Sequence, residues 1–463
     1  MLRKITAIAF LSVRSAVRSR FVICLAGILV MVITVLPMTI KGDGTLAGNI
    51  QVLLRYTLGL AAVITGIAAM WTACGSVSQE IEAKQITMVA VKPIHIWQIW
   101  IGKWLGLIAV NAALLLLSGT TVYLLLQKRV AEADLSTEQT GALRDTLLVG
   151  RRRVAPEPES VHDEAHRMLE KLIAEGKVDP DKPLEPVFKS IHERLLAKKN
   201  TVNPGHSRTW TFHVPREFET TLESASKASL RFSFKTGSFR RKSIAGKWIA
   251  RDKTGRETFR SSFSNYLGGT HTMTIPASVL IPGNKVLLTF ENAGPEESST
   301  CVFSGNDQVE ILAKHCSFES NLLKALLVIF CRLALLSAIG LAAGSLFSFP
   351  VAVFAASALV LVSTMVHYST ESGGTVHTCS HHHHGAPVNE ETFVYKLGEK
   401  AGDRLAAAAG PALKTRSLGN LSEGILISWP LAGRVLAVTG LLYPAFFGIA
   451  GVVGLMKREL ASP

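Results

Sequence analysis

The sequence has few acidic residues and no phosphate-binding loop. It contains 35 Asp and Glu against 49 Lys and Arg, which gives a formal net charge of +14. The pattern G-x-x-x-x-G-K-[ST] does not occur, so we do not expect this chain to bind ATP through a P-loop. Charged residues make up only 18% of the chain, whereas 48% of the residues are hydrophobic, more than a soluble protein needs. These features favour a membrane protein over a soluble one.

Charge is especially scarce in six apolar runs, each close to the roughly 20 residues with which an α-helix crosses a bilayer. None shows the polar stripe of a surface helix. We therefore predict a polytopic α-helical membrane protein with six transmembrane helices. The first run lacks an A-x-A-like cleavage site and is expected to remain as an anchor. The runs are Phe21–Ile40, Leu53–Cys74, Ile101–Leu126, Leu322–Leu346, Phe349–Val366 and Leu431–Met456.

Basic residues around these runs predict the topology. Five basic residues and no acidic residue precede the first run, while Lys457 and Arg458 follow the last. By the positive-inside rule both termini are expected in the cytoplasm, which an even number of spans requires. The placement of the basic residues thus fits a protein of the cytoplasmic (inner) membrane, and the net positive charge does not require a nucleic-acid partner. We expect none.

A charged segment without apolar runs, residues 127–320, interrupts the spans and predicts an extracytoplasmic domain. Its first part, 127–200, has helical spacing of apolar residues, and its second part, 201–318, has the alternation of a β-sandwich. The remaining parts follow in chain order. They are a cytoplasmic interfacial helix (1–20), three transmembrane helices with a cytoplasmic segment at 76–100 (21–126), two further transmembrane helices (321–368), an outer histidine-containing loop (369–430), and the last helix with a cytoplasmic tail (431–463).

The cytoplasmic segment carries the candidate functional residues. It opens with Glu80 and Glu82, passes through Lys92-Pro93, and reaches Lys103 at the start of the next span. The two carboxylates offer charge to a partner protein, and the proline removes a backbone donor and presets the following turn. The alternative interpretation is a solvated loop in which Trp97, Trp100 and Trp104 anchor the third span at the membrane interface.

The stretch Gln79–Lys103 resembles the link between spans two and three in permeases of the second ABC exporter class. Ser417–Ile427, Gly440–Tyr443 and Lys457–Leu460 resemble the C-terminal third of that family, which includes the nitrous-oxide-reductase maturation permeases. Members commonly carry an arginine shortly after Lys-Pro, where this chain has Ile96, so any role of that arginine has no counterpart here.

The resemblance implies the transmembrane subunit of an ABC transporter, with export as the expected direction. ATP and Mg²⁺ would then bind a separate ATPase subunit, and this chain would need no cofactor of its own. A second permease copy or a related permease would complete the usual twelve spans. Glu80, Glu82, Lys92, Pro93 and Lys103 would form the ATPase-coupling segment.

Three further features leave alternatives open. Arg332 within the fourth run could face the bundle interior or a partner, or could snorkel to the interface. Cys301 and Cys316 both lie in the segment expected outside, where a disulfide could form. A tract of histidines could bind Cu or Zn or could be a polar loop. Its candidate ligands are His377, Cys379, His381, His382, His383 and His384.

Two other functional classes compete with transport. The spans could transmit nucleotide-driven motion to the outer domain, which would then act as a mechanical or binding module without transporting anything. An enzyme is not expected, because no Ser/His/Asp, paired-carboxylate or metal-protease pattern stands out in residues 127–320.

Overall fold

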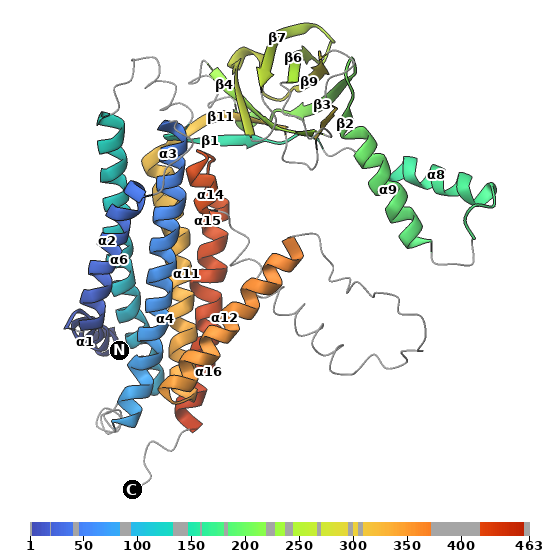
Figure 1. The fold of residues 1–463 in the computed structure, drawn as a ribbon. Coiled ribbons are helices and arrows are strands. Elements are labelled where there is room, and N and C mark those ends of the chain that lie inside the picture. The colour runs from blue at the N-terminus through green and yellow to red at the C-terminus, as the bar shows by residue number, and fades with distance from the viewer. Residues whose placement is uncertain are drawn as a thin grey trace. The chain divides into compact units, whose positions relative to one another are not determined.

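The computed structural model describes residues 2–18, 20–39, 46–83, 94–132, 147–157, 160–179, 184–218, 227–236, 244–265, 270–294, 300–303, 309–371 and 417–457. The chain forms two compact units. One comprises Met1–Leu148 with Ser317–Pro463, and the other is Val149–Cys316. The first unit is helical, and the second contains the strands (Figure 1).

Four helices of the first unit are long and apolar enough to cross a membrane, counted among the described residues. One combines α3 (Leu46–Val52), the π-helical segment η1 (Leu53–Thr57) and α4 (Leu58–Glu82). Two are single helices, α6 (Ile96–Glu132) and α11 (Phe318–Leu346). The fourth combines α15 (Trp429–Val435), the π-helical segment η4 (Leu436–Leu442) and α16 (Tyr443–Lys457).

Two more regions of the helical unit are apolar but less clear as spans. Helices α1 (Leu2–Arg18) and α2 (Arg20–Thr39) are bent against each other and count as a fifth span only if the pair is taken as one. Helix α12 (Phe349–Glu371) is apolar over the shorter stretch Phe349–Met365. A multi-pass helical protein is therefore supported by four helices, and the six-span count stays a prediction.

Helix α11 packs against α4, α6, α12 and α16 (Figure 1). Its contact with α4 depends on Gly340 and Gly344, which lie one turn apart on one face. A Cβ atom added at Gly340 would lie 2.6 Å from the Met70 carbonyl oxygen, and one added at Gly344 would overlap the Cys74 carbonyl oxygen. Small residues at this spacing let two helix backbones approach closely within a membrane.

Glycines also allow close packing of α1 against α6. A Cβ atom at Gly102 would lie 2.7 Å from Ile8 Cβ, and one at Gly106 would lie 2.6 Å from Ser12 Cβ. The segment expected as an interfacial helix is thus helical over residues 2–18, and one face of it contacts α6.

In the described residues of the second unit, the strands form two four-stranded sheets, ordered β1-β11-β4-β8 and β3-β9-β6-β7, and a three-stranded sheet, β2-β10-β5. Helices α8 (His162–Ala174) and α9 (Glu185–Lys199) come between β1 and β2. The strands are β1 (Val149–Val154), β2 (Thr201–Val202), β3 (Ser207–His213), β4 (Lys227–Ser233), β5 (Lys235–Thr236), β6 (Ile244–Asp252), β7 (Glu257–Asn265), β8 (Thr270–Pro276), β9 (Lys285–Asn292), β10 (Cys301–Val302) and β11 (Val309–Ser317).

The strand pairs β4–β11, β4–β8, β3–β9, β6–β9 and β6–β7 are antiparallel, and their register brings aromatic side chains into one core. Trp210 of β3 pairs with Leu288 of β9, and Trp248 of β6 pairs with Phe290 of β9. The Trp248 ring lies 5.2 Å from Phe290 and 5.1 Å from Phe232 of β4, centroid to centroid. Residues of both four-stranded sheets therefore share one hydrophobic core.

Cys301 is a fully buried free thiol, so the disulfide to Cys316 is not formed in this structure. Burial raises the pKa of the Cys301 thiol to about 12. At neutral pH the thiol is protonated, and only a thiolate reacts rapidly with alkylating reagents. We expect N-ethylmaleimide to leave Cys301 unmodified in the native protein and to label it in denaturant, as peptide mass spectrometry would measure. A cysteine at the exposed turn, Lys253→Cys, is the matched control, and equal native labelling of both sites would contradict the prediction.

Candidate partner-coupling site

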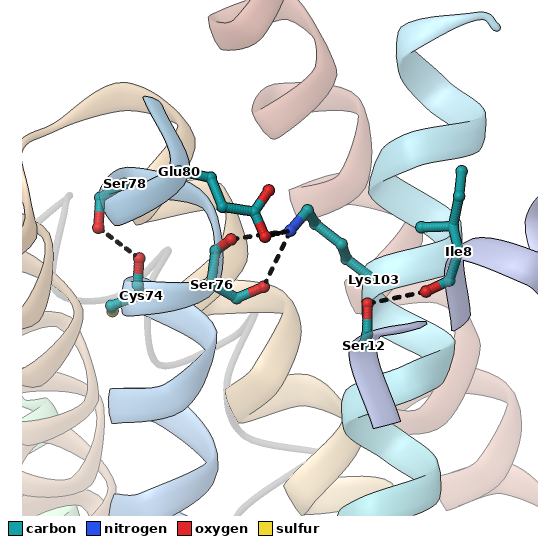
Figure 2. A network of polar contacts seen from close by, with 7 residues as sticks. All are labelled: Ile8, Ser12, Cys74, Ser76, Ser78, Glu80 and Lys103. Atoms are coloured by element: carbon teal, nitrogen blue, oxygen red, sulfur yellow. Dashed lines mark hydrogen bonds and ion pairs between the residues drawn. The ribbon is translucent and has the colours of Figure 1, made fainter. Parts of the chain in front are cut away.

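The end of α4 meets the beginning of α6 in a polar cluster made by Ser76, Glu80 and Lys103. The Lys103 ammonium lies 2.5 Å from Glu80 Oε1 and donates to the Ser76 carbonyl oxygen at 2.8 Å. The Ser76 hydroxyl oxygen is a third, longer contact at 3.4 Å. Figure 2 shows the lysine reaching from α6 toward both residues of α4.

The helical repeat explains why two acceptors converge on one cation. Ser76 and Glu80 are four residues apart in α4, so they occupy the same face. The neighbouring Ser78 points elsewhere, and its hydroxyl donates to the Cys74 carbonyl at 2.7 Å (Figure 2). Such back-bonding satisfies a hydroxyl inside an apolar helix without a partner from another helix.

Burial is unequal within the ion pair. The Lys103 side chain is 7% exposed, whereas the Glu80 side chain is 37% exposed. An ammonium taken out of water is costly unless acceptors compensate it, and here the carboxylate and the Ser76 oxygens do so. Glu80 is therefore needed within the chain to balance Lys103, whatever contact it makes with another protein.

Glu82 makes a different contact. Its Oε1 accepts a long hydrogen bond, 3.4 Å, from the backbone N–H of Phe349, the first residue of α12. A carboxylate at a helix N-terminus interacts favourably with the helix dipole. Glu82 is exposed, as are Gln79 and Ala83 beside it. These three are the exposed residues among those described at this end of the helix, and we call them the exposed end of α4.

The structure thus brings Glu80 and Lys103 together and places Glu82 nearby at the end of the same helix. Lys92 and Pro93 lie outside the described residues. So does the histidine tract, with His377, Cys379, His381, His382, His383 and His384. Within the described part of the chain no group of three or more His, Cys, Asp or Glu side chains is arranged to hold a metal ion.

Arg332 is half-buried in α11. Its neighbour Cys331 is buried and faces η4, where a Cβ atom added at Gly440 would lie 3.2 Å from the Cys331 sulfur. This part of α11 therefore packs against the π-helical segment of the last span.

The tryptophans at the start of α6 have structural partners that the sequence interpretation missed. Trp100 is buried, stacks on Trp104 at a centroid distance of 6.2 Å, and fills the space above Gly448 and Gly451 of α16. The Trp104 indole N–H donates to the Ala334 carbonyl of α11 at 3.0 Å. Trp100 thus joins α6 to α16, and Trp104 joins α6 to α11. The spacing of Gly448 and Gly451 in the last apolar run was the signal in the sequence that a large side chain could pack there.

Two buried asparagines were also missed. Asn111 of α6 donates to the Ser337 hydroxyl of α11 at 3.0 Å. Asn321 of α11 donates to the Ile425 carbonyl at 2.9 Å and accepts from the Ile427 N–H at 2.8 Å. Asn111 lies within an apolar run and Asn321 directly precedes one. A lone amide at such a place is expensive in a membrane unless it is paired, so each asparagine was a signal for a helix contact.

No family model matches the chain, and neither does any curated protein or solved structure.

Proposed function

We propose that the chain is the transmembrane subunit of an ABC transporter, an exporter that couples ATP hydrolysis by a separate subunit to substrate movement across the cytoplasmic membrane. In this proposal α2, α3 to α4, α6, α11, α12 and α15 to α16 are the six spans, and both termini are cytoplasmic. The unit Val149–Cys316 would be an extracytoplasmic β-sandwich with a helical pair. The ATPase would bring ATP and Mg²⁺, and a second permease would complete the assembly.

The observation that carries the proposal is the Lys103–Glu80 ion pair at the two ends of the connection between α4 and α6. That connection contains the stretch resembling exporter permeases, Gln79–Lys103. The ion pair fixes α4 to α6 at this end, and Glu82 contacts the start of α12. A force applied to the connection would therefore act on three helices together, as coupling through packed rigid elements requires.

The exposed end of α4 supports partner contact more directly than Glu80 does. Glu82 is exposed and its hydrogen bond from the Phe349 N–H is long, so its charge remains available to a basic groove on an ATPase. Charged residues that become desolvated at an interface contribute to affinity and partner choice.

We expect Glu82→Lys to weaken binding of the cognate P-loop ATPase at least tenfold, which corresponds to about 1.4 kcal/mol. The measurement is affinity in detergent or nanodiscs, together with substrate-stimulated ATP hydrolysis and transport in proteoliposomes. Glu132→Lys is the matched control, because Glu132 is an exposed carboxylate at the opposite end of α6. Unchanged affinity and ATP hydrolysis in Glu82→Lys would contradict partner coupling at this site.

A non-transporting mechanical module is the second candidate. The observation that favours it is the separate unit Val149–Cys316, which has its own hydrophobic core. ATP-dependent motion of this unit in proteoliposomes, without movement of any substrate, would distinguish this function from export.

A further inference from the structure

Two histidines lie side by side on the helical pair of the second unit. His162 and His166 are four residues apart on α8, so they share one face. Their Nε2 atoms are 3.1 Å apart, and their ring centroids are 4.5 Å apart. The simplest interpretation of this distance is a hydrogen bond from one neutral imidazole to the other.

The same distance fits two ligands of one metal ion. Imidazole nitrogens bind Zn²⁺ at about 2.0–2.1 Å, and two such bonds ending 3.1 Å apart enclose an angle of about 100° at the metal. Adjacent ligands enclose about 90° in square-planar or octahedral sites and about 109° in tetrahedral ones. The separation of the two nitrogens is therefore compatible with both binding one metal ion in place of the shared proton.

The surroundings hold both rings in place and leave them accessible. Phe188 of α9 lies 5.2 Å from the His162 ring and 4.5 Å from the His166 ring, so it limits their rotamers. Both histidines are exposed, and Asp163 in the first turn of α8 adds negative charge that attracts a cation, whereas Glu164 is ion-paired with Lys199 at 3.3 Å. His192 lies beyond Phe188, 6.1 Å from it.

We propose that His162 and His166 form a binding site for a divalent transition metal ion, Cu²⁺, Ni²⁺ or Zn²⁺, through both Nε2 atoms, with water in the remaining positions. Imidazole suits all three ions, and Cu²⁺ binds most tightly. The site is open, and it does not depend on the proposed transport function. The sequence signal is His-Asp-Glu-Ala-His at 162–166, which has the histidine spacing of helical zinc sites.

The test uses the full chain in detergent, with the separate histidine tract removed by replacing His377, Cys379 and His381 to His384 with alanine. Cu²⁺ is titrated, and electron paramagnetic resonance counts the imidazole nitrogens on the bound ion. We expect two imidazoles per Cu²⁺. We also expect at least a tenfold loss of affinity in His162→Ala and in His166→Ala, because each removes the chelate.

Two controls separate the chelate from nonspecific binding. His192→Ala keeps the pair and should bind Cu²⁺ as tightly as the parent. The double variant His166→Arg with Arg167→His keeps the composition but moves one imidazole to another helix face, so it should lose affinity like His166→Ala. Unchanged affinity in the single variants or in this double variant, or an equal loss in His192→Ala, would overturn the proposal. Circular dichroism checks that α8 stays folded in each variant.

Discussion

Replacing Gly344 by alanine should disrupt the packing of α11 on α4, at a cost of about 3 kcal/mol in the free energy of unfolding. The new Cβ atom would overlap the Cys74 carbonyl oxygen, which is backbone and cannot move away as a flexible side chain could. The helices would have to separate along a contact that contains Gly340, Met70 and Ala73. Loss of close backbone approach is costly in a membrane, where van der Waals packing rather than the hydrophobic effect holds helices together.

The matched control is Gly27→Ala in α2. A Cβ atom added at Gly27 would meet nothing within 4 Å, so this substitution should be neutral or should stabilise the helix by up to ~1 kcal/mol. Both variants make the same chemical change in an apolar helix. Thermal unfolding in detergent, followed by tryptophan fluorescence, measures the difference. Equal unfolding temperatures for Gly344→Ala and Gly27→Ala would contradict the packing argument.

Apolar runs in the sequence predict where the long helices lie, but they do not predict where the helices end. The third run ends at Leu126, whereas α6 continues to Glu132. Its last residues are polar helix formers such as Gln127 and Lys128, and hydropathy does not register them. Similarly, β1 lies in a region expected to be helical, because its strand pairing depends on β11, a partner far along the chain.

The sequence pattern grouped the candidate residues in one segment but did not predict their contacts. Glu80 and Lys103 were placed in one coupling segment, yet their ion pair spans 23 positions and depends on how α4 packs against α6. From their charge alone, Glu80 and Glu82 were expected to have the same role. The structure separates them, since Glu80 balances a buried cation while Glu82 remains exposed. Joint charge reversal at both positions would therefore mix a folding defect with a binding defect.

Glu80→Lys alone should destabilise the helical unit by about 3–5 kcal/mol, because it places a second ammonium beside the buried Lys103. Lys103→Glu should reduce the free energy of unfolding by a similar amount, because it places a second carboxylate beside Glu80 at a buried position. The double variant Glu80→Lys with Lys103→Glu restores opposite charges and should recover part of the loss. Recovery should be incomplete, because the Ser76 carbonyl that accepts from Lys103 would then face a carboxylate.

A double-mutant cycle isolates the energy of this pair. The coupling between positions 80 and 103 should exceed ~2 kcal/mol, since removing one partner leaves a buried charge. The control cycle uses Lys128 and Glu132, an i,i+4 pair on the same helix α6 whose side chains are 68% and 58% exposed. Solvent screens that pair, and its coupling should stay near ~0.3–0.5 kcal/mol. If the two cycles give the same small coupling, Lys103 does not depend on Glu80, and its contact with Ser76 and the packing of α4 on α6 would have to join the two helices at this end.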